Sequence, residues 1–201
     1  SATRVNSSQL IEKGRENLLT HSNGFLDWWS KPVSTITDGQ AGYDGTNNAS
    51  LLSKTGAAGS IYRSVSTSGV HTFSVYAKAG TLNWIRLTSQ SGNFRADVNL
   101  STGAVGLVGS LIIDTNVTSL SNGWYRIELT GNATTTAVYL FPADGNNDVS
   151  GTSGNIFIQA AQVELGLVAT ESIVSGALTA QAGLLENTPR FDYSGGATCP
   201  S

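Results

Sequence analysis

Residues 70–89 read VHTFSVYAKAGTLNWIRLTS, and two alternating runs within this stretch decide the fold class. The first run places one set of side chains, His71, Phe73, Val75 and Ala77, on the face opposite to Thr72, Ser74, Tyr76 and Lys78. The second run places Ile85 and Leu87 opposite to Trp84, Arg86 and Thr88. A period of two is typical of half-buried β-strands. The stretch therefore predicts two neighbouring strands that share a polar and aromatic outer face.

The same alternation continues along the chain. Further runs occupy residues 60–67, 93–100, 124–130, 136–142 and 155–165, and turn residues such as Ser-Thr-Gly and Ser-Asn-Gly separate them. Helical periodicity is nearly absent. This pattern predicts an all-β protein, an antiparallel β-sandwich of jelly-roll type with extended N- and C-terminal arms.

The two ends of the chain lack this pattern. We expect residues 1–19 to form an N-terminal arm or connector, residues 20–173 the β-sandwich jelly-roll module, and residues 174–201 a C-terminal arm or linker. At the boundary between the module and this tail, residues 171–185 contain scattered apolar residues and predict a short helix or an arm packed on a neighbouring subunit. The chain starts at Ser1 and contains no Met, which suggests a processed product or an excerpt from a longer polypeptide.

Composition narrows the possible partners. The net charge is -3, and no Lys/Arg-rich run is present, which argues against nucleic acid because phosphate binding needs clustered cations. No apolar run is long enough for membrane insertion. Charged residues make up only 12% of the chain, so its surface suits neutral partners such as glycans or a crowded assembly.

The sequence offers little for catalysis. His21 and His71 are the only histidines, and the apolar register of His71 favours a packed position over a catalytic one. Cys199 is the only cysteine, so no internal disulfide can form, and it lies in a linker-like end with no preorganised partner. Too few sulfur and imidazole ligands are present for a structural zinc site. We therefore expect a protein that is not an enzyme.

Two oxygen-rich loops are candidates for calcium, which prefers carboxylate and amide oxygens. The first contains Asp144, Asn146 and Asp148. The second contains Asp38, Asp44 and Asn47. Neither has the length or terminal Glu of an EF-hand, so a plain polar hairpin is the favoured alternative at both.

Four segments resemble one family when they are taken in order: ENLLTHSNGFLDWW, HTFSVYAKAG, LSNGWYRIELT and IFIQAAQVELGLVATESI. The set, which spans residues 16–173, resembles a jelly-roll module of tailed-bacteriophage virion proteins, especially tail-fibre and other appendage proteins. That module is related to carbohydrate-binding modules with a concanavalin-like or galactose-binding-like sandwich. The resemblance implies a virion-surface or extracellular location, other virion subunits or a homo-oligomer as partners, and a structural calcium near the sheet edge.

Six side chains on the outer register of their strands are candidates for carbohydrate binding: Tyr76, Trp84, Arg86, Trp124, Arg126 and Glu128. Aromatic rings stack on the C–H faces of sugars, and the polar groups bind hydroxyls. If these strands share one sheet, the six side chains make a continuous platform for a cell-surface or environmental polysaccharide. The alternative is that Trp84 and Trp124 are packing residues under the N-terminal arm or another subunit.

These observations predict a non-enzymatic virion appendage module, in a tail fibre, capsid fibre or capsid decoration, that serves glycan adhesion or fibre assembly. One alternative is a carbohydrate-binding module appended to a secreted polysaccharide-degrading enzyme. Another is a purely structural spacer domain.

Overall fold

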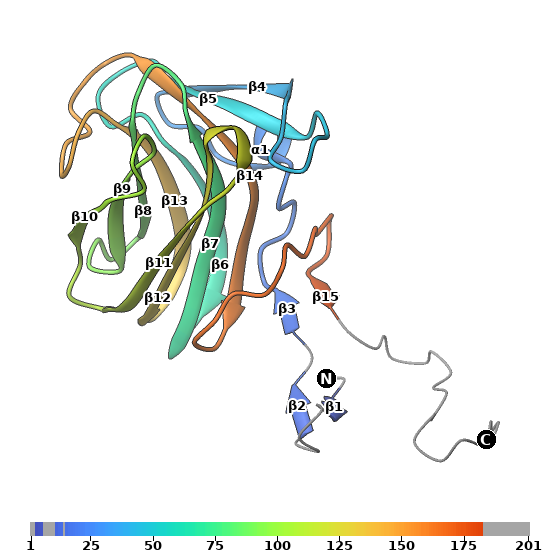
Figure 1. The fold of residues 1–201 in the computed structure, drawn as a ribbon. Helices are drawn as coiled ribbons and strands as arrows, with labels where there is room; N and C mark the ends of the chain where they lie inside the picture. Colours follow the sequence, from blue (N-terminus) through green and yellow to red (C-terminus); the bar gives the residue numbers. More distant parts are fainter. Residues whose placement is uncertain (1–2, 6–10, 14, 183–201) are drawn as a thin grey trace.

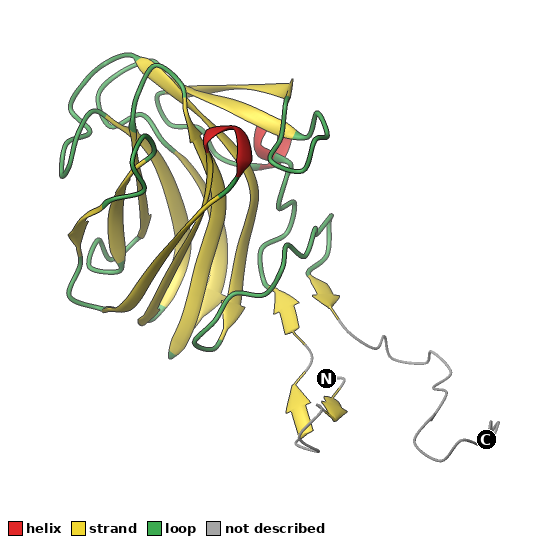
Figure 2. Cartoon of the chain, in the orientation of Figure 1, coloured by secondary structure: helices red, strands yellow, loops and turns green. Residues whose placement is uncertain are grey.

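The alternating runs fold into two antiparallel β-sheets that face each other across one apolar core (Figure 1). The computed structural model describes residues 3–5, 11–13 and 15–182. Strands and loops make up almost all of this part of the chain (Figure 2). The predicted all-β antiparallel sandwich is confirmed, and its architecture is consistent with a jelly roll.

The first sheet has five strands in the order β10-β9-β8-β13-β6. Its strands are β6 (Ile61–Thr67), β8 (Trp84–Ser89), β9 (Arg95–Asn99), β10 (Val105–Val108) and β13 (Thr135–Ala143). The second sheet has six strands in the order β11-β12-β7-β14-β5-β4. Its strands are β4 (Ser34–Gln40), β5 (Ala49–Lys54), β7 (Val70–Ala79), β11 (Ile112–Ser119), β12 (Trp124–Asn132) and β14 (Gly154–Leu165).

The core contains the apolar face that the alternation predicts. Phe73 and Val75 of β7 are fully buried against Ile85 and Leu87 of the opposite sheet's β8 and the other apolar side chains between the sheets. Each such side chain contributes about 1.5–3 kcal/mol on burial. His71 is also buried in its predicted packed position, with its ring stacked on Phe94 at a centroid distance of 4.6 Å.

The two strands of residues 70–89 belong to different sheets, which corrects the prediction that they are neighbours with a shared outer face. β7 lies between β12 and β14 in the six-stranded sheet, whereas β8 lies between β9 and β13 in the five-stranded sheet. The connection at Gly80 crosses from one sheet to the other, and its backbone is so close to Asn155 that a Cβ there would lie 2.2 Å from the Asn155 Oδ1 atom. The outer faces of β7 and β8 therefore point to opposite sides of the molecule.

Residues on both sides of the range 20–173 pack against the sandwich. Asn17 is fully buried, and its side-chain amide donates two hydrogen bonds to backbone carbonyl groups and accepts two from backbone N–H groups. Leu19 is part of the core, and Ser175 is buried beside it, with its hydroxyl donating to the Leu19 carbonyl. Asn17 thus fastens the N-terminal arm to the six-stranded sheet.

Two short antiparallel pairs lie outside the sandwich. β3 (Arg15–Asn17) pairs with β15 (Ala180–Ala182), and β1 (Thr3–Val5) pairs with β2 (Ile11–Lys13). The predicted helix within 171–185 is wrong for the described residues up to 182, because the chain there is irregular until β15. Figure 1 shows β3 and β15 side by side at one end of the sandwich. Cys199 and the predicted linker beyond residue 182 lie outside the described residues.

The described helices are short. α1 (Phe25–Trp28) and the 3-10 turn η1 (Ser121–Gly123) were not predicted from the sequence. The two adjacent tryptophans at the end of α1 differ in exposure, because Trp29 is buried whereas Trp28 is 54% exposed and stacks on His21. Neither helix has the length and apolar character required to cross a membrane.

Candidate functional site

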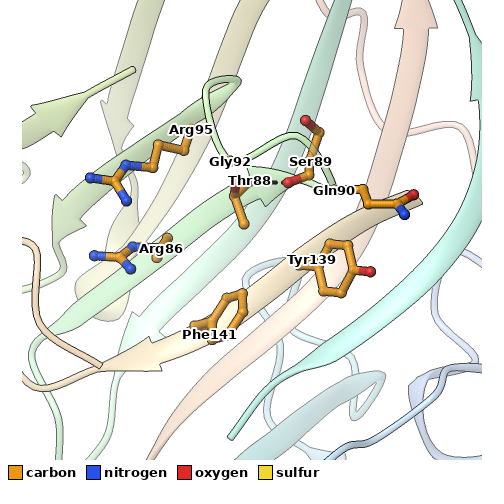
Figure 3. Close-up of a pocket in the computed structure, with 8 residues that line it drawn as sticks. All are labelled: Arg86, Thr88, Ser89, Gln90, Gly92, Arg95, Tyr139 and Phe141. Carbon is orange, nitrogen blue, oxygen red and sulfur yellow. Dashed lines mark hydrogen bonds between the residues drawn. The ribbon is translucent and has the colours of Figure 1, made fainter. Parts of the chain in front are cut away.

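An open groove of about 230 Å³ lies on the outer face of the five-stranded sheet (Figure 3). It is formed by β8, β9, the turn between them and β13. The residues that line it are Arg86, Thr88, Ser89, Gln90, Gly92, Arg95, Tyr139 and Phe141. In Figure 3 the two guanidinium groups lie together at one side, and the two aromatic rings lie along β13.

Strand register fixes the order of side chains across the groove. Tyr139 of β13 pairs with Tyr62 of β6 on one side and with Thr88 of β8 on the other, and Thr88 pairs with Arg95 of β9. These four residues therefore form one row across four strands that are spaced about 4.8 Å apart. The row begins with two aromatic rings and ends with a guanidinium group.

Three partly buried aromatic rings form a strip beside the groove. Tyr62 and Tyr139 stack at a centroid distance of 4.9 Å, and Phe141 follows Tyr139 at 6.2 Å. Tyr62 and Tyr139 are paired on adjacent strands, Phe141 lies two residues farther along β13, and the ring planes differ by 28° and 23°. Such rings suit stacking on the apolar C–H face of a sugar, while neighbouring polar groups bind its hydroxyls.

A buried ion pair fixes the position of one guanidinium group. Arg86 Nε donates to Asp97 Oδ1 at 2.7 Å, and Arg86 Nη2 donates to Asp97 Oδ2 at 2.9 Å. The hydrogen bonds that Arg86 donates to Asp97 raise the pKa of Arg86, so this group stays charged. Asp97 faces outward from β9, and it is nevertheless fully buried because a loop covers it.

That covering loop contains the first predicted calcium site. The Asn147 backbone N–H donates to Asp97 Oδ2 at 2.6 Å, with Asn147 in the left-handed region at φ 58°. Its side-chain Oδ1 accepts hydrogen bonds from Arg95 Nη2 at 2.9 Å and Arg86 Nη2 at 3.3 Å. The loop therefore connects the two arginines of the groove.

The three predicted calcium ligands are each hydrogen-bonded within the protein. Asp144 Oδ2 accepts a hydrogen bond from the buried Lys54 ammonium group at 2.6 Å, and Asp148 Oδ1 accepts two from Ser150. Asn146 Oδ1 accepts a hydrogen bond from a backbone N–H of β10 at 2.7 Å. Across the described residues, no group of three or more His, Cys, Asp or Glu side chains is arranged to hold a metal ion. The Lys54 ammonium group places a positive charge beside Asp144 in this loop.

The second oxygen-rich loop is also held by hydrogen bonds within the protein. Asp38 Oδ1 accepts one from Ser50, and Asp44 accepts hydrogen bonds from Thr46 and from the Gln159 side chain. Burial opposes ionisation of Asp44, but these hydrogen bonds outweigh it and lower the pKa of Asp44 overall. Asn47 and Asp38 both line a shallow hollow nearby.

The outer face of the six-stranded sheet is covered by the protein's own loops. Tyr43 stacks flat on Tyr76 at a centroid distance of 3.6 Å and meets Trp124 edge-on at 6.4 Å. Trp124 is consequently only 1% exposed. The packing alternative is right for Trp124, although the cover is the loop that carries Tyr43 rather than the N-terminal arm or another subunit.

A second hollow, of about 430 Å³, lies beside this cluster. Arg126 and Tyr76 contribute to its lining, with Arg126 above the Tyr76 ring at 5.6 Å. Arg126 also forms an ion pair with Glu128 at 3.1 Å and donates to the Thr170 carbonyl. Arg126 is thus engaged with Glu128, Thr170 and the Tyr76 ring, and Tyr43 and Tyr76 each cover one face of the other.

The six predicted sugar-binding residues therefore do not form one platform. Tyr76, Trp124, Arg126 and Glu128 lie on the six-stranded sheet, whereas Trp84 and Arg86 lie on the opposite sheet. Of the six, Arg86 alone lines the groove. Trp84 is on the same face but farther along β8, partly buried in close contact with Gly106.

The sequence interpretation missed Tyr62, Tyr139, Phe141 and Arg95. The signal was present, because Tyr62 alternates with buried Ile61, and Tyr139 and Phe141 alternate with buried Leu140. Their outward register could have been read in the same way as that of Trp84. What alternation does not encode is which outward-facing strands are neighbours.

The sequence matches no protein-family model and no curated protein. Among solved structures, the enzymatically active domain of tailspike protein 4 of bacteriophage CBA120 is similar over 75% of this chain and 21% of that one, with 16% identity and a TM-score of 0.44. The CBM22-1 xylan-binding domain of a Paenibacillus barcinonensis protein is similar over 79% of this chain and 99% of that one, with 16% identity and a TM-score of 0.43. The chain thus spans about a fifth of the tailspike chain.

A third similar structure holds the CBM22-1 and GH10 modules of the Clostridium thermocellum N-terminal endo-1,4-beta-D-xylanase 10B, complexed with xylohexaose. The similarity covers 80% of this chain and 30% of that chain, with 12% identity and a TM-score of 0.44.

Proposed function

We propose that this protein is a non-catalytic glycan-binding module and that the groove on the five-stranded sheet is its binding site. The observation that carries the proposal is the row of side chains across the groove, in which aromatic rings lead through Thr88 to Arg95. A sugar ring stacked on Tyr139 would have hydroxyl, amide and guanidinium groups within the same groove. This combination of an apolar ring face and convergent polar groups suits a carbohydrate.

We propose that the groove binds glycans without cleaving them. Glycoside hydrolysis generally needs two carboxyl groups on either side of the scissile bond. Among the residues that line the groove there is no carboxyl group, and Asp97 behind it is engaged in the bidentate pair with Arg86. Incubation with any glycan that binds should therefore release no reducing sugar.

Affinity electrophoresis in gels that contain soluble polysaccharides tests the proposed site. We expect a binding polysaccharide to retard the wild type, and Tyr139→Ala and Phe141→Ala to weaken binding at least about tenfold, because each removes a stacking ring. Trp28→Ala is the matched control, since it deletes an exposed ring on α1 that does not line the groove. Equal retardation of all four proteins, or retardation of none by a broad polysaccharide panel, would reject the groove as a glycan site.

We further propose that the module works on a virion appendage, where it contributes to host adhesion or fibre assembly. The ordered sequence motifs support this setting, and so does the pairing of β3 with β15, which brings the two connecting arms together at one end of the sandwich. The coding sequence around residues 1–201 tests the setting. Virion genes or repeated modules would support it, whereas a neighbouring polysaccharide-degrading catalytic domain would support the carbohydrate-binding module of a secreted enzyme.

A further inference from the structure

The groove has a local charge opposite in sign to that of the chain. The whole protein has 14 acidic and 11 basic side chains and a net charge of -3. The residues that line the groove nevertheless include two arginines and no carboxylate. A neutral ligand does not require this positive charge, because uncharged amides and hydroxyls also bind its hydroxyl groups.

The charge of Arg95 lacks compensation. Arg86 is neutralised by Asp97, whereas Arg95 Nη2 donates to the neutral side-chain oxygen of Asn147 at 2.9 Å. Among the described residues, Arg95 forms no ion pair with a carboxylate within 4.0 Å. Of the covering loop's carboxylates, Asp144 is paired with Lys54, and Asp148 accepts hydrogen bonds from Ser150 and interacts electrostatically with Arg86.

Arg95 and Tyr139 lie at a separation suited to one ligand. Both pair with Thr88 in the row across the sheet, so two strand spacings, about 10 Å, separate their backbones. Their side chains both line the groove between them. An arginine fork matches the planar, two-oxygen geometry of an acidic group and can bind it with two hydrogen bonds.

We propose that the groove binds an anionic glycan: the acidic group, a carboxylate or a sulfate, binds Arg95, and a sugar ring of the same glycan stacks on Tyr139. This inference rests on the proposed glycan-binding function and adds the substrate class to it. Arg86, held by Asp97, keeps Asn147 in place and so positions the side chain to which Arg95 is hydrogen-bonded.

The test compares matched ligands by affinity electrophoresis and calorimetry. The carboxylated probes are polygalacturonate and hyaluronate, each measured beside its carboxyl-reduced form, and the sulfated probe is carrageenan beside its desulfated form. The variants are Arg95→Gln, which removes the charge, Arg95→Lys, which keeps the charge without the fork, and Tyr139→Ala. Arg95 is partly exposed at the surface, so these variants should keep the fold, which thermal unfolding verifies.

We expect the wild type to bind at least one acidic probe about tenfold more tightly than its neutral form, with Arg95→Gln losing that preference and Arg95→Lys recovering part of it. Added salt should weaken wild-type binding to the acidic probe more than it weakens binding by Arg95→Gln. Comparison of the carboxylated probes with the sulfated probe identifies which acidic group Arg95 binds.

If acidic and neutral forms bind equally and Arg95→Gln changes nothing, while Tyr139→Ala loses binding, the inference fails and the glycan site stands. If no probe binds and no neutral polysaccharide binds either, both proposals fail.

Discussion

Arg86 and Asp97 form a bidentate ion pair between two adjacent strands, with nitrogen-to-oxygen distances of 2.7 and 2.9 Å, on what would otherwise be a solvent-facing surface. Arg86 lines the groove, Asp97 lies behind it, and the backbone N–H of Asn147 donates a further hydrogen bond to Asp97. The covering loop, the two arginines and the aromatic strip are thereby held in one arrangement. The stability of this pair should therefore govern the shape of the site.

The Asp97→Asn substitution should lower the free energy of unfolding by about 3–5 kcal/mol, because it leaves the largely buried guanidinium of Arg86 without its charge partner. Urea unfolding measures this change. Asp114→Asn, at an exposed carboxylate on β11, is the control and should stay within about 0.5 kcal/mol of the wild type. Equal effects of the two variants would show that the pair does not hold this face together.

Removing Trp124 should affect stability and leave glycan binding intact. Trp124→Ala empties a buried position beneath Tyr43 and should cost about 3–5 kcal/mol in the free energy of unfolding. Trp124→Phe keeps most of the packing and provides folded protein for affinity electrophoresis, where retardation should equal that of the wild type. If folded Trp124→Phe protein no longer bound the polysaccharide, the glycan site would lie on the six-stranded sheet, which would contradict the proposal.

His71 should make the stability depend on pH. Burial lowers the pKa of His71 in the folded protein from 6.5, with the Gly69 carbonyl opposing this only in part. The unfolded chain therefore binds a proton more readily than the folded one, and stability falls as pH drops below about 6.5. The lowered pKa values of Asp44 and Asp148 act in a more acidic range, below 3.8.

Thermal unfolding across this pH range measures the effect. His71→Gln lacks the ionisable ring, so its melting temperature should be lower at neutral pH but should change less between neutral pH and the acid side of 6.5. Parallel pH profiles for the two proteins would contradict the assignment to His71.

Calcium should not stabilise the protein. A calcium ion at residues 144–148 would have to displace the Lys54 ammonium from Asp144 and the Ser150 groups from Asp148. Melting temperatures in millimolar calcium chloride and in EDTA should therefore coincide. A bound ion at a hundredfold excess over its Kd would add about 2.7 kcal/mol, so a clear rise with calcium that Asp148→Asn abolishes would contradict this reading.

Much of the fold follows from alternation, and the parts that do not follow have identifiable causes. The inward set from Phe73 to Leu129 was predictable because burial on one face imposes a period of two. The assignment of β7 and β8 to opposite sheets was not, because a short connection can join strands within one sheet or between two. β4 was missed because Asp38 and Gly39 within it are typical of turns.

The site was less predictable than the fold, since it depends on contacts between distant residues. Arg86 was identified from its register, but its pairing with Asp97 and the covering role of Asn147 depend on a loop some fifty to sixty positions away. The oxygen-rich composition of that loop suggested calcium because Lys54, ninety positions away, leaves no local sign in the sequence. Trp124 was correctly placed on the outer register, yet only the structure reveals that Tyr43 covers it.

The most direct test of the groove as the glycan site is an NMR titration of the labelled protein with the tightest-binding polysaccharide fragment. We predict the largest amide shift changes at Thr88, Gln90 and Arg95 on β8, β9 and their turn, and at Tyr139 on β13. Changes confined instead to Thr118, Glu171 and Ser172, which line the hollow on the six-stranded sheet, would contradict the account.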